Sequence, residues 1–454
     1  MLSGLARSDE AWTMVDVASR PQRPSRPQPT ETLANPPAPL DLPRSRFGGC
    51  GGLPTKPSGY FRVERTDNRW WLVDPDGFAF LSIGANSVRP LDSPAARAAF
   101  GRAFGGENGW AAATIDQLRA AGFNTLGAWS AADLLGSRPA PLPYVKLWSF
   151  MAAYGRRRGG TVMLPGHVGY PGDCPFIFDP EFPAFCDEHA AQLALIRDDP
   201  WLIGHCADNE LPWSPELLDR YLALPTPDAG HRAAQAWLAE ARGGIADGRP
   251  PTDAERSGFL EHACETYLIT VAQAIRRHDP HHLFLGMRLH GQALRRPEVF
   301  RACGRHCDVV SLNYYHAWTP DPELLSMWAT ESGRPFIVTE FYAKGADSGL
   351  GNTSGAGWLV PTQADRGRFY QHFTLSLLRN EACVGWHWHR YSDNDPDEAG
   401  VDPSNHDSNK GIVSSRYEPW TPLLAAMTAV NLRAYGLRVG AESPAGAGLG
   451  KQGH

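Results

Sequence analysis

The chain has 454 residues, of which 42% are hydrophobic and 20% are charged. This balance excludes a wholly disordered chain, because disordered chains are poorer in apolar residues and richer in charge. The formal charge of −6 argues against nucleic acid or an anionic membrane as the main partner, since both select basic patches. Its apolar runs fall short of the roughly 20 residues that a membrane span needs.

The first 55 residues contain RPQRPSRPQPT, NPPAPLDLP and GGCGG. Because such Pro-rich and Gly-rich composition cannot build a core, we expect a disordered arm over 1–55, with a partner-binding polyproline segment as the alternative. The N-terminus has no apolar stretch of the signal-peptide kind, and the eight cysteines form no Cys-x-x-Cys pair. Both features predict a cytoplasmic protein.

Order is expected to begin near Tyr60, with two short strands and a turn at Asp74–Gly77. Apolar strands and amphipathic helices then alternate. The predicted helices cover 108–122, 180–199, 255–280, 364–380 and 419–437. The predicted strands cover 79–86, 123–129, 143–148, 201–207, 283–288, 307–314, 335–341 and 383–389.

Eight continuous apolar strands, most of them preceded by a helix, are typical of a parallel sheet that is covered on both faces. They predict a (β/α)8 TIM barrel over 56–440, with a short N-terminal β-segment before it and a flexible tail over 441–454. Nucleotide-binding folds lose support, because no Gly-x-Gly-x-x-Gly follows an early strand and no Walker A pattern occurs.

Two carboxylates close predicted strands. Glu210 ends strand four after Asp208 and Asn209, and Glu340 ends strand seven. A barrel carries its chemistry at the carboxyl ends of its strands, and paired carboxylates with separately tuned pKa values suit glycosidic bond cleavage. As alternatives, Glu210 is a helix-start carboxylate and Glu340 a buried salt-bridge partner of Lys344 or Arg288.

Other polar and aromatic residues at the predicted strand ends are candidate substrate contacts. They are Asn86, Trp129, Asn209, Arg288, Tyr314, Tyr315, His316, Trp386 and Trp388, with Asp393 in the loop after strand eight. The tryptophans are candidate platforms for a sugar ring, although one of them could instead fill a barrel layer. The acidic loop departs from the 12-residue calcium pattern, and no zinc spacing occurs, so we expect no metal.

The Asn-Glu pair after strand four and the Glu after strand seven resemble the clan A retaining glycoside hydrolases. Within that clan, four stretches resemble the exo-acting β-agarases of family fifty. They are RWWLVDPDGFAFLSIGANSV, WLIGHCADNELPW, GWHWHRYSDND and SNKGIVSSRYEPW. The resemblance spans about residues 59–437.

This resemblance implies roles for individual residues. Glu210 corresponds to the acid/base, Glu340 to the nucleophile, and Asn209 to the residue that contacts the substrate 2-hydroxyl. Tyr315 or Tyr314 corresponds to the tyrosine that orients the nucleophile. Trp386 or Trp388 corresponds to the platform under the reacting sugar.

We therefore expect a retaining β-glycoside hydrolase that acts on β-linked galactosides or related oligosaccharides. Retaining enzymes place their two carboxyl groups about 5–5.5 Å apart. A transglycosidase of the same clan, a different glycan substrate and a non-catalytic carbohydrate-binding barrel remain open. The expected partner is an oligosaccharide or polysaccharide, with no nucleic acid, no membrane, no cofactor and a possible homo-oligomer.

Overall fold

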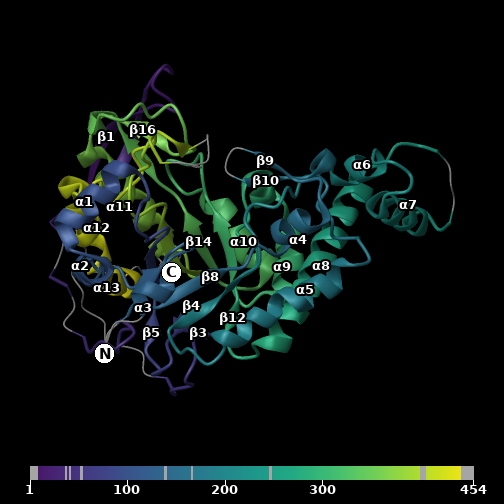
Figure 1. Cartoon of the computed structure of the whole chain (residues 1–454), viewed down its shortest axis with the longest axis horizontal. Helices are drawn as coiled ribbons and strands as arrows, with labels where there is room; N and C mark the ends of the chain where they lie inside the picture. Colours follow the sequence, from purple (N-terminus) through teal and green to yellow (C-terminus); the bar gives the residue numbers. More distant parts are fainter. Residues whose placement is uncertain are drawn as a thin grey trace, which may run out of the picture.

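A curled sheet of eight parallel strands forms the centre of the molecule, and helices surround it (Figure 1). The computed structural model describes residues 9–35, 38–39, 42–51, 55–136, 141–164, 167–244, 248–398 and 405–440. The strands are, in spatial order, β12 (Leu283–Phe284), β11 (Leu202–Cys206), β8 (Tyr144–Leu147), β7 (Thr125–Leu126), β6 (Ser82–Ala85), β17 (Cys383–Trp388), β14 (Phe336–Glu340) and β13 (Val310–Asn313). This is a TIM-like α/β fold.

Each of the eight predicted strands has a counterpart in this sheet, so the eight strands are confirmed. The observed strands are shorter than predicted. The pairing of β7 spans two residues, Thr125 and Leu126, where an apolar run over 123–129 predicts a longer strand. The extra apolar residues belong to the strand-to-helix connections, which are buried as well and therefore look alike in the sequence.

The helices begin and end where the local chemistry favours it. Thr252 and Glu255 form a capping box at the start of α8, and three basic residues stand in its last turn. The helices are α1 (Pro94–Phe104), α2 (Glu107–Ala120), α3 (Ala132–Gly136), α4 (Phe150–Arg158), α5 (Phe182–Ala190), α6 (Leu217–Leu222), α7 (Ala229–Ala241), α8 (Asp253–His278), α9 (Pro297–His306), α10 (Pro322–Ser332), α11 (Gln363–Arg379), α12 (Thr421–Asn431) and α13 (Ala434–Gly440). No helix of the described chain is long and apolar enough to cross a membrane.

A small antiparallel sheet precedes the first central strand, as predicted. It contains β3 (Arg62–Thr66), β4 (Arg69–Val73) and β5 (Ala79–Phe80). Asp67 and Asn68 join β3 to β4 with positive φ angles of 49° and 62°, which is the geometry of a tight hairpin turn. Asp74 fixes the next turn, because its carboxylate accepts the backbone N–H of Asp76 and of Phe78.

The expectation of a disordered arm over 1–55 is wrong for a large part of this segment. Residues 9–35 form an antiparallel hairpin of β1 (Asp9–Val17) and β2 (Arg26–Asn35). On β2, the backbone N–H groups of Glu31 and Leu33 point away from β1 and donate to His372 and Gln371 of α11.

The prolines of this segment fit the hairpin because of their register. Pro27 and Pro29 share the odd-numbered register of Glu31, so their missing N–H groups would also have pointed away from β1. An edge strand tolerates proline in such positions, because no ladder hydrogen bond is lost. Composition alone could not reveal this.

Further strand pairs lie beyond the central sheet. The hairpin of β9 (Val162–Leu164) and β10 (His167–Gly169) follows α4, and β15 (Ala343–Gly345) pairs with β16 (Trp358–Val360) after β14. In Figure 1 the labelled strands β9, β10 and β16 lie in the upper half of the view, and β3 and β5 lie near the bottom. The tail that we predicted to be flexible, 441–454, lies outside the described residues.

Candidate active site

Two glutamates mark the carboxyl ends of β11 and β14. Glu340 is the last residue of β14 and is 5% exposed. Glu210 follows β11, is partly exposed, and has a positive φ of 57°. Because parallel strands end at the same edge of a sheet, both carboxyl groups belong to one site.

Two hydrogen bonds hold the Glu340 carboxylate. Arg288, after β12, donates from Nη2 to Oε1 at 2.6 Å. Tyr315, after β13, donates its hydroxyl to Oε2 at 2.5 Å. Each of the two carboxylate oxygens thus accepts one hydrogen bond, and together these bonds fix the orientation of the carboxylate.

Glu210 has a different environment. Its Oε1 accepts a hydrogen bond of 2.7 Å from the side-chain amide of Asn313. Burial and, next, the negative charge of Glu340 raise the pKa of Glu210 to about 7, against the opposing effects of Asn313 and Arg288. The raised pKa keeps this carboxyl group protonated to a higher pH than an ordinary glutamic acid, as a proton donor requires.

Asn209 connects the two glutamates through their partners. Its Oδ1 accepts from Nη1 of Arg288 at 2.9 Å and from Nδ2 of Asn313 at 3.2 Å. Since the amide oxygen is occupied, the amide nitrogen is the group left to contact a ligand. The predicted residues Asn209, Glu210, Arg288, Tyr315 and Glu340 are thus brought together by the structure.

An aromatic residue stands at the mouth of this site. Trp129, after β7, is 41% exposed, and the Arg288 guanidinium lies 4.3 Å from the centre of its ring. Asn86, after β6, lies within the same constellation, because its amide donates to the Thr339 carbonyl oxygen at 2.7 Å. His316 is exposed after β13, with its ring centre 6.5 Å from that of Trp358.

Sequence reasoning missed three side chains of the site. His389 lies with Nδ1 3.8 Å from Oε2 of Glu340, and Asn313 holds Glu210. The ring of Tyr342 lies 5.6 Å from that of Tyr315 and 5.9 Å from that of His389. The alternation in WHWHR sets His387 and His389 opposite the two tryptophans, but it does not show which of the two faces lies inside.

The prediction that Trp386 or Trp388 is a sugar platform is wrong. Both are buried, at 1% and 0% exposure. The indole of Trp386 donates to the Tyr370 hydroxyl of α11 at 2.8 Å, and that of Trp388 donates to the Lys410 carbonyl oxygen at 2.7 Å. The tryptophan face of β17 therefore packs against α11, and the histidine face points to the inside of the sheet.

Two further predicted contacts are structural. Tyr314 is buried against Trp328, and its hydroxyl accepts the backbone N–H of Asp321. Asp393 is 1% exposed and accepts hydrogen bonds from Asn409, Trp420 and the backbone of Gly411. Its carboxylate organises the loop after β17 and does not face a ligand.

The backbone is strained where the strands end. Non-glycine residues with φ between 49° and 61° follow six of the central strands: Ser87, Trp129, Ser149, Glu210, Arg288 and His316. Left-handed backbone costs a non-glycine residue on the order of 1 kcal/mol, and such residues gather at functional sites. Four of these residues, Trp129, Glu210, Arg288 and His316, carry side chains described above.

Comparison with known proteins identifies relatives of the chain. No family model matches the chain. The solved structure of BpGH50 superimposes with a TM-score of 0.83 and 29% sequence identity, covering 96% of this chain and 98% of that one. The chain is a relative of the family 50 glycoside hydrolases (GH50). The agarase AgWH50C has the same fold, with a TM-score of 0.72 at 24% identity over 88% of this chain and 67% of its own.

Sequence relatives agree with the GH50 relationship. Beta-agarase B of Vibrio sp. (strain JT0107) is 26% identical over 504 residues, which cover 87% of this chain and 50% of that protein. Beta-agarase A of the same strain is 25% identical, covering 84% of this chain and 46% of its own length. The chain thus spans about half the length of the curated relatives it matches. The resemblance to family fifty is confirmed.

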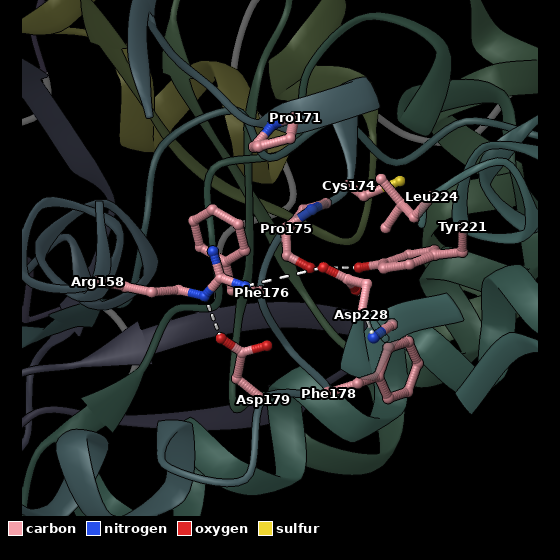
Figure 2. Close-up of a pocket in the computed structure, with 11 residues that line it drawn as sticks. Arg158, Pro171, Cys174, Pro175, Phe176, Phe178, Asp179, Tyr221, Leu224 and Asp228 are labelled. Carbon is pink, nitrogen blue, oxygen red and sulfur yellow. Dashed lines mark hydrogen bonds and ion pairs between the residues drawn. The ribbon is translucent and has the colours of Figure 1, made fainter. Parts of the chain in front are cut away.

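Two other features of this GH50 relative lie apart from the glutamates. A cavity of about 30 Å³, which Figure 2 shows, is lined by residues that include Arg158, Phe176 and Tyr221. Its volume suits a water molecule or two and is too small for a sugar ring.

The second feature is the buried trio of His205, Asp279 and His282, whose possible metal-ligating atoms lie within 4.8 Å of one another. Both imidazoles hydrogen-bond Oδ2 of Asp279, at 2.8 and 2.7 Å. Their other nitrogens already contact Trp148 and the Asp199 carbonyl oxygen. The trio is therefore a complete hydrogen-bond network, which has no need of a metal ion.

Proposed function

We propose that this protein is a retaining β-glycoside hydrolase that acts on β-linked galactosides of agarose-type oligosaccharides. One observation carries the proposal: the two strand-end glutamates have different environments. Glu210 has a pKa raised to about 7, and Glu340 is held by Arg288 and Tyr315. Cleavage with retention requires one carboxyl group as a proton donor and one as a nucleophile.

The proposed reaction has two steps. In the first, protonated Glu210 donates its proton to the glycosidic oxygen while a Glu340 carboxylate oxygen attacks the anomeric carbon. The bond to the leaving oxygen breaks, and a covalent glycosyl ester forms on Glu340. In the second step, ionised Glu210 takes a proton from water, the water oxygen attacks the anomeric carbon, and Glu340 is released.

The substrate part of the proposal rests on the relatives and on the exposed aromatic ring. Relatives carry the names β-agarase A and β-agarase B. Trp129 offers an exposed apolar face beside the glutamates, which suits the C–H face of a sugar ring. The amide nitrogen of Asn209 and the exposed imidazole of His316 are proposed as hydroxyl contacts.

We also infer that the central sheet is a closed (β/α)8 barrel. The edge strands β12 and β13 support this, because Leu289 and Leu312 form a parallel bridge just beyond β12. Backbone N–H groups of Leu289 and Asn313 donate to the carbonyl oxygens of Ser311 and Leu289, at 3.0 and 2.7 Å. Closure would arrange all eight strand ends around one mouth.

Hydrolysis of β-configured aryl glycosides and agar-derived oligosaccharides tests the function. We expect turnover of at least one galactoside, abolished in Glu340→Gln and retained in the surface control Glu323→Gln, which lies exposed on α10. Thermal unfolding of both variants shows whether they remain folded. Full activity in Glu340→Gln, or no turnover of any galactoside by folded wild-type protein, would contradict the proposal.

A further inference from the structure

A buried lysine next to the nucleophile strand holds a loop by its carbonyl groups. Lys344, in β15, is 0% exposed. Its ammonium donates to the backbone carbonyl oxygens of Asn352, Ser354 and Gly355, at 3.2, 2.9 and 3.2 Å. A buried ammonium is costly unless its donors are used, and here three acceptors of one short segment use them.

The same segment is held from its other side by a carboxylate. Asp407 lies in the loop after β17 and is 7% exposed. Its Oδ2 accepts the Thr353 backbone N–H at 2.9 Å and the Thr353 hydroxyl at 2.6 Å. Its Oδ1 accepts the Ser354 backbone N–H at 2.9 Å and also the Ser354 hydroxyl. A cation on the carbonyl side and an anion on the N–H side thus fix residues 352–355.

Residues 355–357, at the end of this segment, pack against the side chain of Tyr342. A Cβ atom on Gly355 would lie 2.4 Å from the Tyr342 hydroxyl, so the backbone of this segment runs directly beside that group. A Cβ atom on Gly357 would lie 2.4 Å from ring carbons of Tyr342, so the backbone lies directly against that ring and only glycine fits. The Tyr342 ring also lies beside the Lys410 ammonium and beside the rings of Tyr315 and His389, two of the side chains around Glu340.

We propose that Lys344 and Asp407 are positioning residues that clamp segment 352–357 and thereby hold Tyr342, Tyr315 and His389 in place around Glu340. Neither residue touches the reacting atoms. The catalytic consequence of the clamp rests on the proposed function, whereas its physical action on the segment does not.

Local opening of the segment tests the physical action. Hydrogen exchange is measured on peptides that cover 352–358 in wild type, Lys344→Met, Asp407→Asn and the exposed-lysine control Lys56→Met. We expect faster exchange in both clamp variants and no change in the control. Unchanged exchange in folded Lys344→Met would overturn the proposal. If Lys344→Met does not fold, Thr353→Val replaces it as the test variant, because it removes the hydrogen bond from the Thr353 hydroxyl to Asp407. Unchanged exchange in folded Thr353→Val would then overturn the proposal.

Steady-state kinetics test the catalytic consequence. A displacement of about 1 Å around a reacting group costs up to about 100-fold in rate, so we expect kcat/KM to fall by roughly 10- to 100-fold in each clamp variant. Because both ends hold one segment, the double variant should lose no more than the worse single variant. Losses that multiply would show two independent structural roles and would overturn the proposal.

The two failures can be told apart. If wild-type protein hydrolyses no glycoside, the proposed function fails, and the exchange experiment still decides whether the clamp exists. If wild type is active, and the clamp variants exchange faster but keep full kcat/KM, the positioning role fails while the proposed function stands.

Discussion

Glu210 sets the expected pH dependence of the proposed reaction. Its carboxyl group must be protonated in the first step, and its pKa is raised to about 7. In kcat/KM we therefore expect an alkaline limb near pH 7, where the proton donor is lost. The sign follows from the role, because an acid catalyst is present below its pKa and absent above it.

Asn313 provides a way to move that limb. Its amide donates to Glu210 and favours the ionised form, so it lowers the pKa of Glu210. Asn313→Ala should raise this pKa and shift the alkaline limb of kcat/KM to higher pH. Glu323→Gln on the surface of α10 leaves every contact of Glu210 in place and serves as the control. A shift to lower pH in Asn313→Ala would contradict the assignment.

Trp129 is expected to bind sugar without supporting the fold. It is 41% exposed, and an aromatic contact contributes about 0.5–1.5 kcal/mol. Trp129→Ala should therefore lower kcat/KM by up to about tenfold, mainly through KM, with little change in melting temperature. Trp12→Ala, at a residue 61% exposed on β1, is the matched control. If kcat/KM falls equally in Trp129→Ala and Trp12→Ala, Trp129 is not a platform for the sugar ring.

The positions of several residues at the strand ends could be predicted from the sequence, whereas the orientation of side chains could not. Glu210, Glu340 and Arg288 could be found because each follows a recognisable apolar strand. Trp386 and Trp388 could not be oriented, since a strand buried on both faces gives no hydrophobic cue to which face lies inside. The choice between Tyr314 and Tyr315 also required the structure, which places Tyr315 on Glu340 and Tyr314 in the core.

At the scale of elements, the hairpin β1–β2 is attached to α11 by a partly buried ion pair. Glu31 is 1% exposed, and Arg379 donates to both of its carboxylate oxygens, to Oε2 at 2.7 Å. Glu31→Ala leaves this guanidinium without its main partner. We expect the free energy of unfolding to fall by about 1–3 kcal/mol.

The matched control for this pair is Asp92→Ala. Asp92 pairs with Arg97 at 2.9 Å on the surface, with side chains 79% and 62% exposed, and such pairs contribute about 1 kcal/mol or less. Denaturant unfolding measures both variants. A Glu31→Ala loss no larger than that of the control would show that the hairpin is only loosely attached.

The elements also show where sequence patterns carry information. The eight central strands and the helix over 255–280 could be predicted, because their apolar periodicity repeats over several turns or strands. The hairpin of residues 9–35 could not, since its fit depends on which proline nitrogens face away from β1. That register is a tertiary property.

At the scale of the whole molecule, one end of the sheet carries the candidate active site and the opposite end carries contacts that stabilise the fold. The carboxyl ends of the strands hold the glutamates. At the opposite end, Arg438 of α13 is buried and donates to the carbonyl oxygens of Trp70, Asn380 and Glu381. This side chain joins the C-terminal helix, the small N-terminal sheet and the start of β17.

Stability and activity should therefore respond independently. Arg438→Met removes the guanidinium donor from three backbone carbonyl oxygens, although those of Glu381 and Asn380 still accept the N–H groups of Trp70 and Cys383. We expect the free energy of unfolding to fall by about 2–4 kcal/mol. At temperatures where the variant stays folded, kcat/KM should remain within about twofold of wild type. A large loss of kcat/KM in folded Arg438→Met would show that the two ends are coupled.

The most direct test of the account is covalent trapping of the nucleophile. A 2-deoxy-2-fluoro-β-galactoside with a good leaving group should form a stable ester, because the fluorine slows its hydrolysis. Mass spectrometry of the digested protein should then find the added sugar on the peptide that contains Glu340. A label on the Glu210 peptide would reverse the two roles, and turnover without any label, with an inverted anomer as product, would contradict the double-displacement mechanism.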